Sequence, residues 1–168
     1  MYKLLLIAFV GMFLTSCGSA RKTSQKSTEY SKERTTKSSN NAKVNSVITY
    51  AKSFKGTRYK FGGTTSSGMD CSGLVYVAFK NQNVHLPRVS RDMATQGKRI
   101  SLGQTVAGDL VFFKTSKSSR NINHVGLVVE AKNGNIYFIH STTSRGVIIS
   151  SLDERYWNSA FVEVRRII

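Results

Sequence analysis

The spacing of hydrophobic and polar residues changes along this chain from a helical period to a strand-like one. Apolar residues recur at helical spacing over residues 44–54, which predicts an amphipathic helix. A glycine-rich loop over residues 56–68 follows, and a second apolar, helix-like run opens at Cys71 and is expected to end near residues 81–83. Residues 85–88 hold the only proline of the chain and indicate a turn.

Beyond residue 97 the pattern takes the two-residue period of strands. Strands are predicted over residues 108–113, 124–130, 135–141, 147–150 and 160–168, of which the second and third form a hairpin. Because the helices come first and the strands follow, we predict an α+β fold in which N-terminal helices pack on a central antiparallel sheet.

The first residues have the pattern of an export signal. Lys3 precedes an apolar run over residues 4–14, which is too short to span a bilayer but suits the core of a secretory signal. Residues 14–17 resemble the lipobox of bacterial lipoproteins, in which the signal is cut before a cysteine that then carries lipid. The resemblance implies a signal peptide over residues 1–16 and lipidation of Cys17. An ordinary signal peptide or a buried apolar end is the alternative.

The next segment is rich in serine, threonine, lysine and asparagine and has Tyr30 as its only aromatic residue. Such a composition cannot bury enough apolar surface to offset the entropy of ordering. We therefore predict a disordered basic tether over residues 17–43 and one globular domain over residues 44–168. If Cys17 is lipidated, Gly18 lacks the aspartate associated with inner-membrane retention, so we expect an outer-membrane anchor facing the periplasm.

The chain is strongly basic, with 25 Lys and Arg against 9 Asp and Glu. The predicted globular domain carries about ten of the excess positive charges, which implies an anionic partner. Nucleic acid is not expected, because the export signal argues against it and no nucleic-acid motif is visible. A carboxylate-rich wall polymer or anionic lipid headgroups fit an exported protein better.

Cys71 is the candidate nucleophile. If Cys17 carries lipid, Cys71 is the only free thiol in an exported protein, although oxidising compartments tend to pair cysteines. A cysteine at the start of a helix lies near unpaired N–H groups and the positive end of the helix dipole, which lower a thiol pKa to about 3.5–7.5. Asp70 can cap the same helix. A buried, inert cysteine is the alternative.

With these features in place, the chain resembles the NlpC-type family of papain-like cysteine peptidases, which cut the peptide part of the bacterial cell wall. The matching segments, which include Asp70-Cys71-Ser72-Gly73 and His124-Val125-Gly126, occur in the order of the family at residues 56–63, 70–75, 86–88, 108–113, 124–127 and 139–140.

The resemblance implies a role for each of four residues. Cys71 would be the nucleophile, His124 the general base and His140 the polar group that orients His124. The backbone N–H of Cys71 and the hydroxyl of Tyr59 would face the developing oxyanion. No cofactor is needed for this chemistry. The histidines could instead be satisfied core residues, and a zinc site formed with Cys71 is disfavoured because the spacing of the three residues is poor for that metal.

Three further residues are candidates for substrate binding: Asp70, Ser72 and Arg88. Asp70 in particular could meet the free amino end of a stem peptide. The chain departs from the family at Arg58, where proline is usual, and at Met93, where glutamine is frequent.

Strand geometry gives a test of the pair His124 and His140 that does not depend on the family. A two-residue hairpin loop would pair His140 with Leu127 and leave the two histidines on opposite faces of the sheet. A loop with an odd number of residues would pair His140 with Gly126, in register with His124. We therefore predict a three- or five-residue connection, with Gly134 at positive φ and a bulge.

Taken together, the residues and the resemblance predict a lipid-anchored cysteine endopeptidase that hydrolyses peptidoglycan through a thioester. The D-glutamyl–diamino acid bond of the stem peptide is favoured, and cleavage of cross-bridges comes next. An amidase or acyltransferase that uses the same thiol is an alternative enzyme. A noncatalytic wall-binding lipoprotein with an inert Cys71 is the alternative from another class.

Overall fold

The computed structural model describes residues 23–116 and 120–168 of the chain. The predicted signal peptide and the lipidation site Cys17 lie outside the described residues, so both stay predictions, as do the domain limits based on them. Within the described ranges, no helix combines the length and the apolar character needed to cross a membrane.

The chain divides into two units, residues 1–35 and residues 36–168, and helix α1 (Thr23–Lys52) runs through the division. In the larger unit, Val47, Ile48 and Ala51 of α1 are buried, as the predicted amphipathic pattern requires. The helix begins at Thr23 rather than at residue 44. The division into a disordered tether over residues 17–43 and a domain over residues 44–168 stays a prediction. Once packed turns have nucleated a helix, further residues extend it at little cost, so residues before 44 can be helical without an apolar period in the sequence.

The main sheet of the larger unit has six strands in the order β3-β8-β4-β5-β6-β7, and all neighbouring strands are antiparallel. The strands are β3 (Lys98–Ile100), β4 (Leu110–Phe113), β5 (His124–Lys132), β6 (Asn135–Thr142), β7 (Gly146–Ser151) and β8 (Phe161–Arg166). The predicted α+β arrangement is confirmed, whereas the short strand β3 was not predicted.

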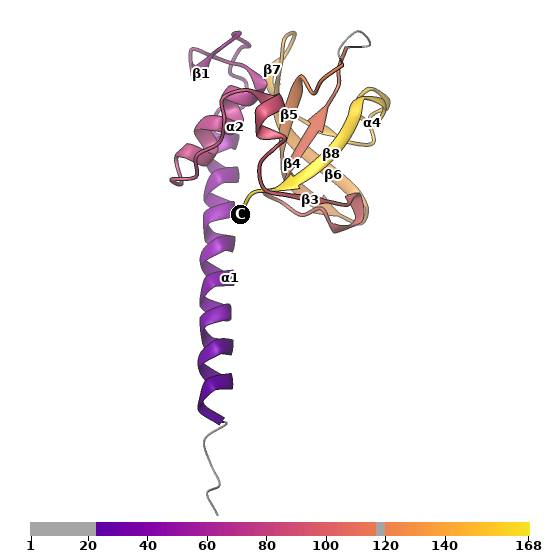
Figure 1. Ribbon diagram of the computed structural model, residues 1–168. Coiled ribbons are helices and arrows are strands. Elements are labelled where there is room, and N and C mark those ends of the chain that lie inside the picture. The colour runs from indigo at the N-terminus through magenta and orange to yellow at the C-terminus, as the bar shows by residue number, and fades with distance from the viewer. Residues whose placement is uncertain (1–22, 117–119) are drawn as a thin grey trace, which may run out of the picture. The chain divides into compact units, whose positions relative to one another are not determined.

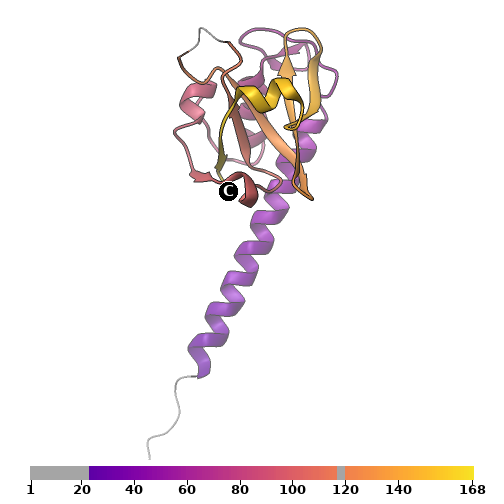
Figure 2. The same ribbon diagram turned by 90° about the vertical axis from the view of Figure 1, so that its right-hand side faces the viewer.

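Helices cover both faces of this sheet. Helix α2 (Cys71–Lys80) packs against β5 and β6 from one side, and α4 (Arg155–Ala160) lies on the other side (Figures 1 and 2). Successive side chains of β4 alternate between the two layers, because Phe112 joins the core next to α2 while Phe113 joins the core around Trp157 of α4. The remaining elements are short: β1 (Thr64–Thr65), β2 (Gly68–Met69), α3 (Ser90–Met93) and a 3-10 turn η1 (Leu102–Gln104).

The hairpin between β5 and β6 has a shorter loop than predicted, yet it brings His124 and His140 to the same face of the sheet, as predicted. Lys132 pairs with Asn135, so the connection is the two-residue loop 133–134, not three or five residues. Both loop residues have positive φ, 54° and 81°, as a tight turn of this type requires. The predicted bulge exists, but it lies within β5 at Val129, between the pairs Val128–Phe138 and Glu130–Tyr137.

The bulge inserts one extra residue into β5. It therefore shifts the pairing of the two strands by one residue, as a loop with an odd number of residues would have done. Before the bulge, Val128 faces the Trp157 core, and after it Ala131 does so, which shows the change of face. The register Leu127–Ile139 continues to place His140 opposite Gly126, on the same face as His124. The two histidines therefore meet, through a bulged strand rather than through a longer loop.

Candidate active site

Cys71 is the first residue of α2, as predicted. Asp70 caps this helix, because its Oδ1 accepts a hydrogen bond of 2.6 Å from the backbone N–H of Gly73. Cys71 is half-buried and unpaired. The sequence thus places a free thiol at a helix N-terminus.

The three predicted substrate-binding residues form one network beneath the thiol. Arg88 donates to both carboxylate oxygens of Asp70, from Nη1 at 2.9 Å and from Nη2 at 2.8 Å. Its Nη1 also donates to the Ser72 hydroxyl at 2.9 Å, and Gly62 N–H donates to Asp70 at 2.8 Å. None of the three lines the cavity that holds Cys71. Their contacts within the protein fix the glycine-rich loop and the start of α2, and their role toward substrate stays a prediction.

The two histidines lie at the starting end of β5 and near the far end of β6. Nε2 of His124 is 3.0 Å from Nδ1 of His140, and Nε2 of His140 is 3.0 Å from the hydroxyl of Ser150 in β7. Trp157 stacks on the His124 ring at 5.1 Å between centroids and 22° between planes, and it meets His140 edge-on at 4.5 Å. His124 is therefore held by a hydrogen bond and by an aromatic face, which leaves its Nδ1 for Cys71.

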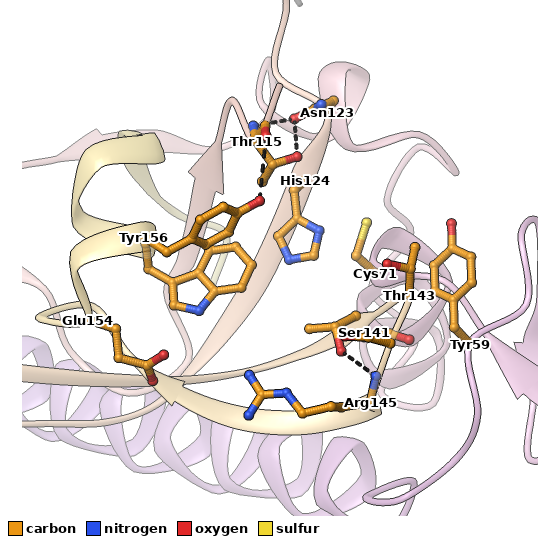
Figure 3. A pocket seen from close by; sticks show the side chains of 13 residues that line it. Tyr59, Cys71, Thr115, Asn123, His124, Ser141, Thr143, Arg145, Glu154 and Tyr156 are labelled. Carbon is orange, nitrogen blue, oxygen red and sulfur yellow. Dashed lines mark hydrogen bonds between the residues drawn. The ribbon is translucent and has the colours of Figure 1, made fainter. Parts of the chain in front are cut away.

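An open cavity of about 420 Å³ brings the thiol and the base together. In Figure 3 a ring nitrogen of His124 is turned toward the side on which the Cys71 sulfur lies, and Tyr59 stands beyond the sulfur. The cavity also has one acidic and one basic side chain on its wall, Glu154 and Arg145. The structure thus brings three of the predicted site residues, Cys71, His124 and Tyr59, to one cavity.

Tyr59 is positioned by backbone pairing. It forms an isolated parallel bridge with Met69, two residues before the thiol. Partial burial, followed by the negative potentials of Cys71 and Asp70, raises the pKa of the Tyr59 hydroxyl. The hydroxyl is therefore protonated at neutral pH and able to donate a hydrogen bond.

The charges of the thiol and the base differ from the sequence prediction. Burial raises the pKa of the Cys71 thiol, although backbone hydrogen bonds involving Val125, Ser72 and Cys71 itself lower it in part. Burial lowers the pKa of His124 to about 4. The shift of the Cys71 pKa is therefore opposite in direction to the predicted lowering by the helix start, and burial favours a neutral thiol beside a neutral imidazole.

His140 is fully buried, and its pKa is lowered further, to about 2, first by burial and then by the positive potentials of His124 and Arg145. A neutral His140 is required for it to accept a hydrogen bond from His124. Across the described parts of the chain, no group of three or more His, Cys, Asp or Glu residues is arranged to hold a metal ion.

Sequence reasoning missed Trp157, Ser150 and the charged wall residues Arg145 and Glu154. A lone tryptophan in a six-residue helix gives no periodic signal. A serine in a strand has no recognisable function in the sequence until the side chains next to it in the fold are known. Since the resemblance stopped at residue 140, nothing pointed to these positions.

Comparison with known proteins adds an independent finding. The model of the NlpC/P60 family matches residues 56–166. The murein DD-endopeptidase MepS/murein LD-carboxypeptidase of Escherichia coli is 41% identical over 116 residues, which cover 68% of this chain and 58% of that protein. The probable endopeptidase NlpC of the same species is 44% identical over 116 residues, 68% of this chain and 72% of that protein.

A gamma-DL-glutamyl hydrolase of Bacillus subtilis is 34% identical over 124 residues, 72% of this chain but only 29% of that protein. A crystal structure described as similar to lipoprotein, NLP/P60 family, from Staphylococcus aureus superposes with a TM-score of 0.66 at 30% identity, over 76% of this chain and 42% of that one. This likeness confirms the papain-like α+β fold. Apart from NlpC, each of these proteins is matched over less than two thirds of its length.

Proposed function

Since this chain belongs to the NlpC/P60 family, we propose that it is a cysteine endopeptidase that hydrolyses peptide bonds in bacterial peptidoglycan. One observation carries the proposal: Cys71 and His124 line a common open cavity, and His140 supports the far nitrogen of His124 at 3.0 Å. The names of the E. coli relatives favour the same substrate and reaction.

The reaction begins with a neutral pair. Nδ1 of His124 takes the proton of the Cys71 thiol as the sulfur bonds to the carbonyl carbon of the scissile amide. The tetrahedral adduct collapses, its C–N bond breaks, and the proton on His124 passes to the leaving amine. A thioester on Cys71 remains, and water attacks it while giving a proton to His124. Collapse then releases the acid and returns the proton to the sulfur.

Two donors would stabilise the negative charge that develops on the carbonyl oxygen. The backbone N–H of Cys71 is at the N-terminus of α2, where helix geometry leaves it without a partner inside the helix. The Tyr59 hydroxyl lines the same cavity. One such donor is worth about 10²–10³ in rate.

Two different bonds remain candidates within the stem peptides. The sequence resemblance favours the D-glutamyl–diamino acid bond, and the name of the B. subtilis relative also refers to a glutamyl bond. The relative named a murein DD-endopeptidase is more similar, at 41% against 34% identity, and it favours the cross-bridge. We therefore place the cross-bridge first and the D-glutamyl bond second.

The lipid anchor and its location are part of the proposal. The lipobox-like residues 14–17 support lipidation of Cys17, and an anchor in the outer membrane facing the periplasm would hold the basic domain close to the wall. Partition of the full chain into a detergent phase, compared with a Cys17→Ala variant, tests the anchor. Equal partition of both into the aqueous phase would contradict it.

The proposed activity is tested by mass spectrometry of purified peptidoglycan fragments after incubation with the full chain. Fragments that appear with the unaltered protein and not with Cys71→Ala establish the peptidase, and their masses identify the bond. If both proteins bind the wall and leave every fragment intact, the noncatalytic wall-binding alternative is favoured. Reaction of the thiol with simple acyl esters alone would favour an amidase or acyltransferase.

A further inference from the structure

Ser150 ends the line of hydrogen bonds that starts at His124, and the proposed peptidase gives it no role. We infer that Ser150 is a positioning residue that fixes the tautomer of His140 and thereby keeps Nδ1 of His124 able to accept the Cys71 proton. This inference rests on the proposed function, although one of its tests does not depend on activity.

The geometry joins three side chains in one row. The Ser150 hydroxyl is 3.0 Å from Nε2 of His140, and Nδ1 of His140 is 3.0 Å from Nε2 of His124. Ser150 in β7 pairs with Phe138 in β6, so its side chain shares a face of the sheet with His140. Ser150 is 3% exposed and His140 is 0% exposed, so bulk water does not substitute for the hydroxyl.

The row has two possible directions, because each neutral imidazole carries one N–H. In the first, His124 donates from Nε2 to His140, and His140 donates from Nε2 to the Ser150 oxygen. This leaves a lone pair on Nδ1 of His124, which is the nitrogen that faces the thiol. In the second, Ser150 donates to His140 and His140 donates to His124, so Nδ1 of His124 carries a hydrogen and accepts nothing.

Only the first direction supports the reaction. When His124 takes the thiol proton it has N–H groups at both nitrogens, so its Nε2 must donate to His140. His140 must then carry its own hydrogen on Nε2, and that N–H needs a buried acceptor, which Ser150 supplies. Across the described residues, no other side chain forms a hydrogen bond with Nε2 of His140.

Two neighbouring aromatic rings keep the His140 side chain from rotating into an orientation that would not need the Ser150 hydroxyl. Phe138 lies at 4.7 Å between ring centroids on one side, and the edge of Trp157 lies at 4.5 Å. A rotated ring would replace a nitrogen by carbon at both hydrogen bonds. The orientation of His140 is therefore fixed by packing, and its tautomer is left to Ser150.

The experiment uses the full chain and three variants: Ser150→Ala, Ser150→Thr and Ser151→Ala. Threonine keeps the hydroxyl. Ser151→Ala is the matched control, since it removes the hydroxyl of the next residue, which points to the other face of β7 and accepts from Asp153 N–H. Turnover of peptidoglycan fragments and two-bond ¹H–¹⁵N spectra of the imidazoles are measured, with thermal unfolding as a check of folding.

We expect Ser150→Ala to lower kcat by about 10- to 100-fold with KM changed less than about twofold, by analogy with the range for loss of a group that orients a metal-binding histidine. Ser150→Thr restores kcat to within about threefold, and Ser151→Ala behaves as the unaltered protein. In the spectra, the hydrogen of His140 lies on Nε2 in the unaltered protein and moves to Nδ1 in Ser150→Ala.

Two results would overturn the inference: an unaltered protein with the His140 hydrogen on Nδ1, or a folded Ser150→Ala variant with unchanged kcat and unchanged spectra. If the unaltered protein cleaves no fragment, the proposed function fails, while the spectra still decide the tautomer.

Discussion

The buried, neutral His124 makes the stability of this protein depend on pH in a direction that can be worked out. Its pKa falls from 6.5 to about 4 on folding. Between these values the unfolded chain binds a proton that the folded protein does not bind, so stability is present in full above pH 6.5 and is lost as the pH falls. At 1.36 kcal/mol per pH unit, the loss from His124 reaches about 3 kcal/mol near pH 4.

The measurement is the free energy of unfolding in urea from pH 7 to pH 4.5, for the unaltered protein and for His124→Gln. The chain has one tryptophan, Trp157, which stacks on His124 and reports loss of the site by fluorescence, with circular dichroism as the second signal. Only the unaltered protein contains His124, so the pH dependence that this side chain contributes is absent from the variant. The difference in slope between the proteins is therefore expected at about 1.4 kcal/mol per pH unit below pH 6.

The opposite sign would refute this description of the site. If Cys71 and His124 formed a thiolate–imidazolium pair, the folded pKa of His124 would lie above 6.5. Stability from His124 would then be complete at low pH and lost as the pH rises. A Cys71→Ser variant separates the two descriptions, since it leaves the profile unchanged for a neutral pair and changes it for an ion pair. A flat difference between the unaltered protein and His124→Gln would refute both.

Three other changes have directions fixed by the structure. Tyr59→Phe removes an oxyanion donor and is expected to lower kcat about 10²- to 10³-fold at unchanged KM in steady-state assays. Arg88→Ala leaves the largely buried Asp70 carboxylate without its cation and is expected to lower the free energy of unfolding by about 2–3 kcal/mol, measured in urea. Arg145 lines the cavity without an ion pair to any described residue. Arg145→Gln is therefore expected to raise KM for carboxylate-bearing fragments about 3- to 10-fold. The control variant Arg155→Gln, which lies outside the cavity wall, is expected to leave KM unchanged.

The sequence predicted the parts of the fold that have a repeating signal. The five longer strands and the helix from Cys71 all appear within a few residues of the expected limits. Helix α4 and strand β3 were missed because elements of six and three residues hold too few positions to establish a period.

The sequence predicted which residues form the site, but not the direction in which the pKa of the Cys71 thiol is shifted. Residue types and their order sufficed to select Cys71 and His124 as partners. Their pKa values depend on desolvation by the completed core, which no local pattern records, and desolvation outweighs the backbone hydrogen bonds to the thiol. A local argument from the helix start therefore had the wrong sign.

The hairpin shows why a correct conclusion came from a wrong step. Asn133 and Gly134 are the residues that favour a two-residue turn, and they form one. The requirement that His124 and His140 share a face is separate from the turn, and any single inserted residue between them satisfies it. Residues 124–128 are buried on both faces of the sheet, so no alternation of polar and apolar positions shows where the insertion lies. The pairing of the histidines fixes that a bulge must exist, and only the three-dimensional register places it at Val129.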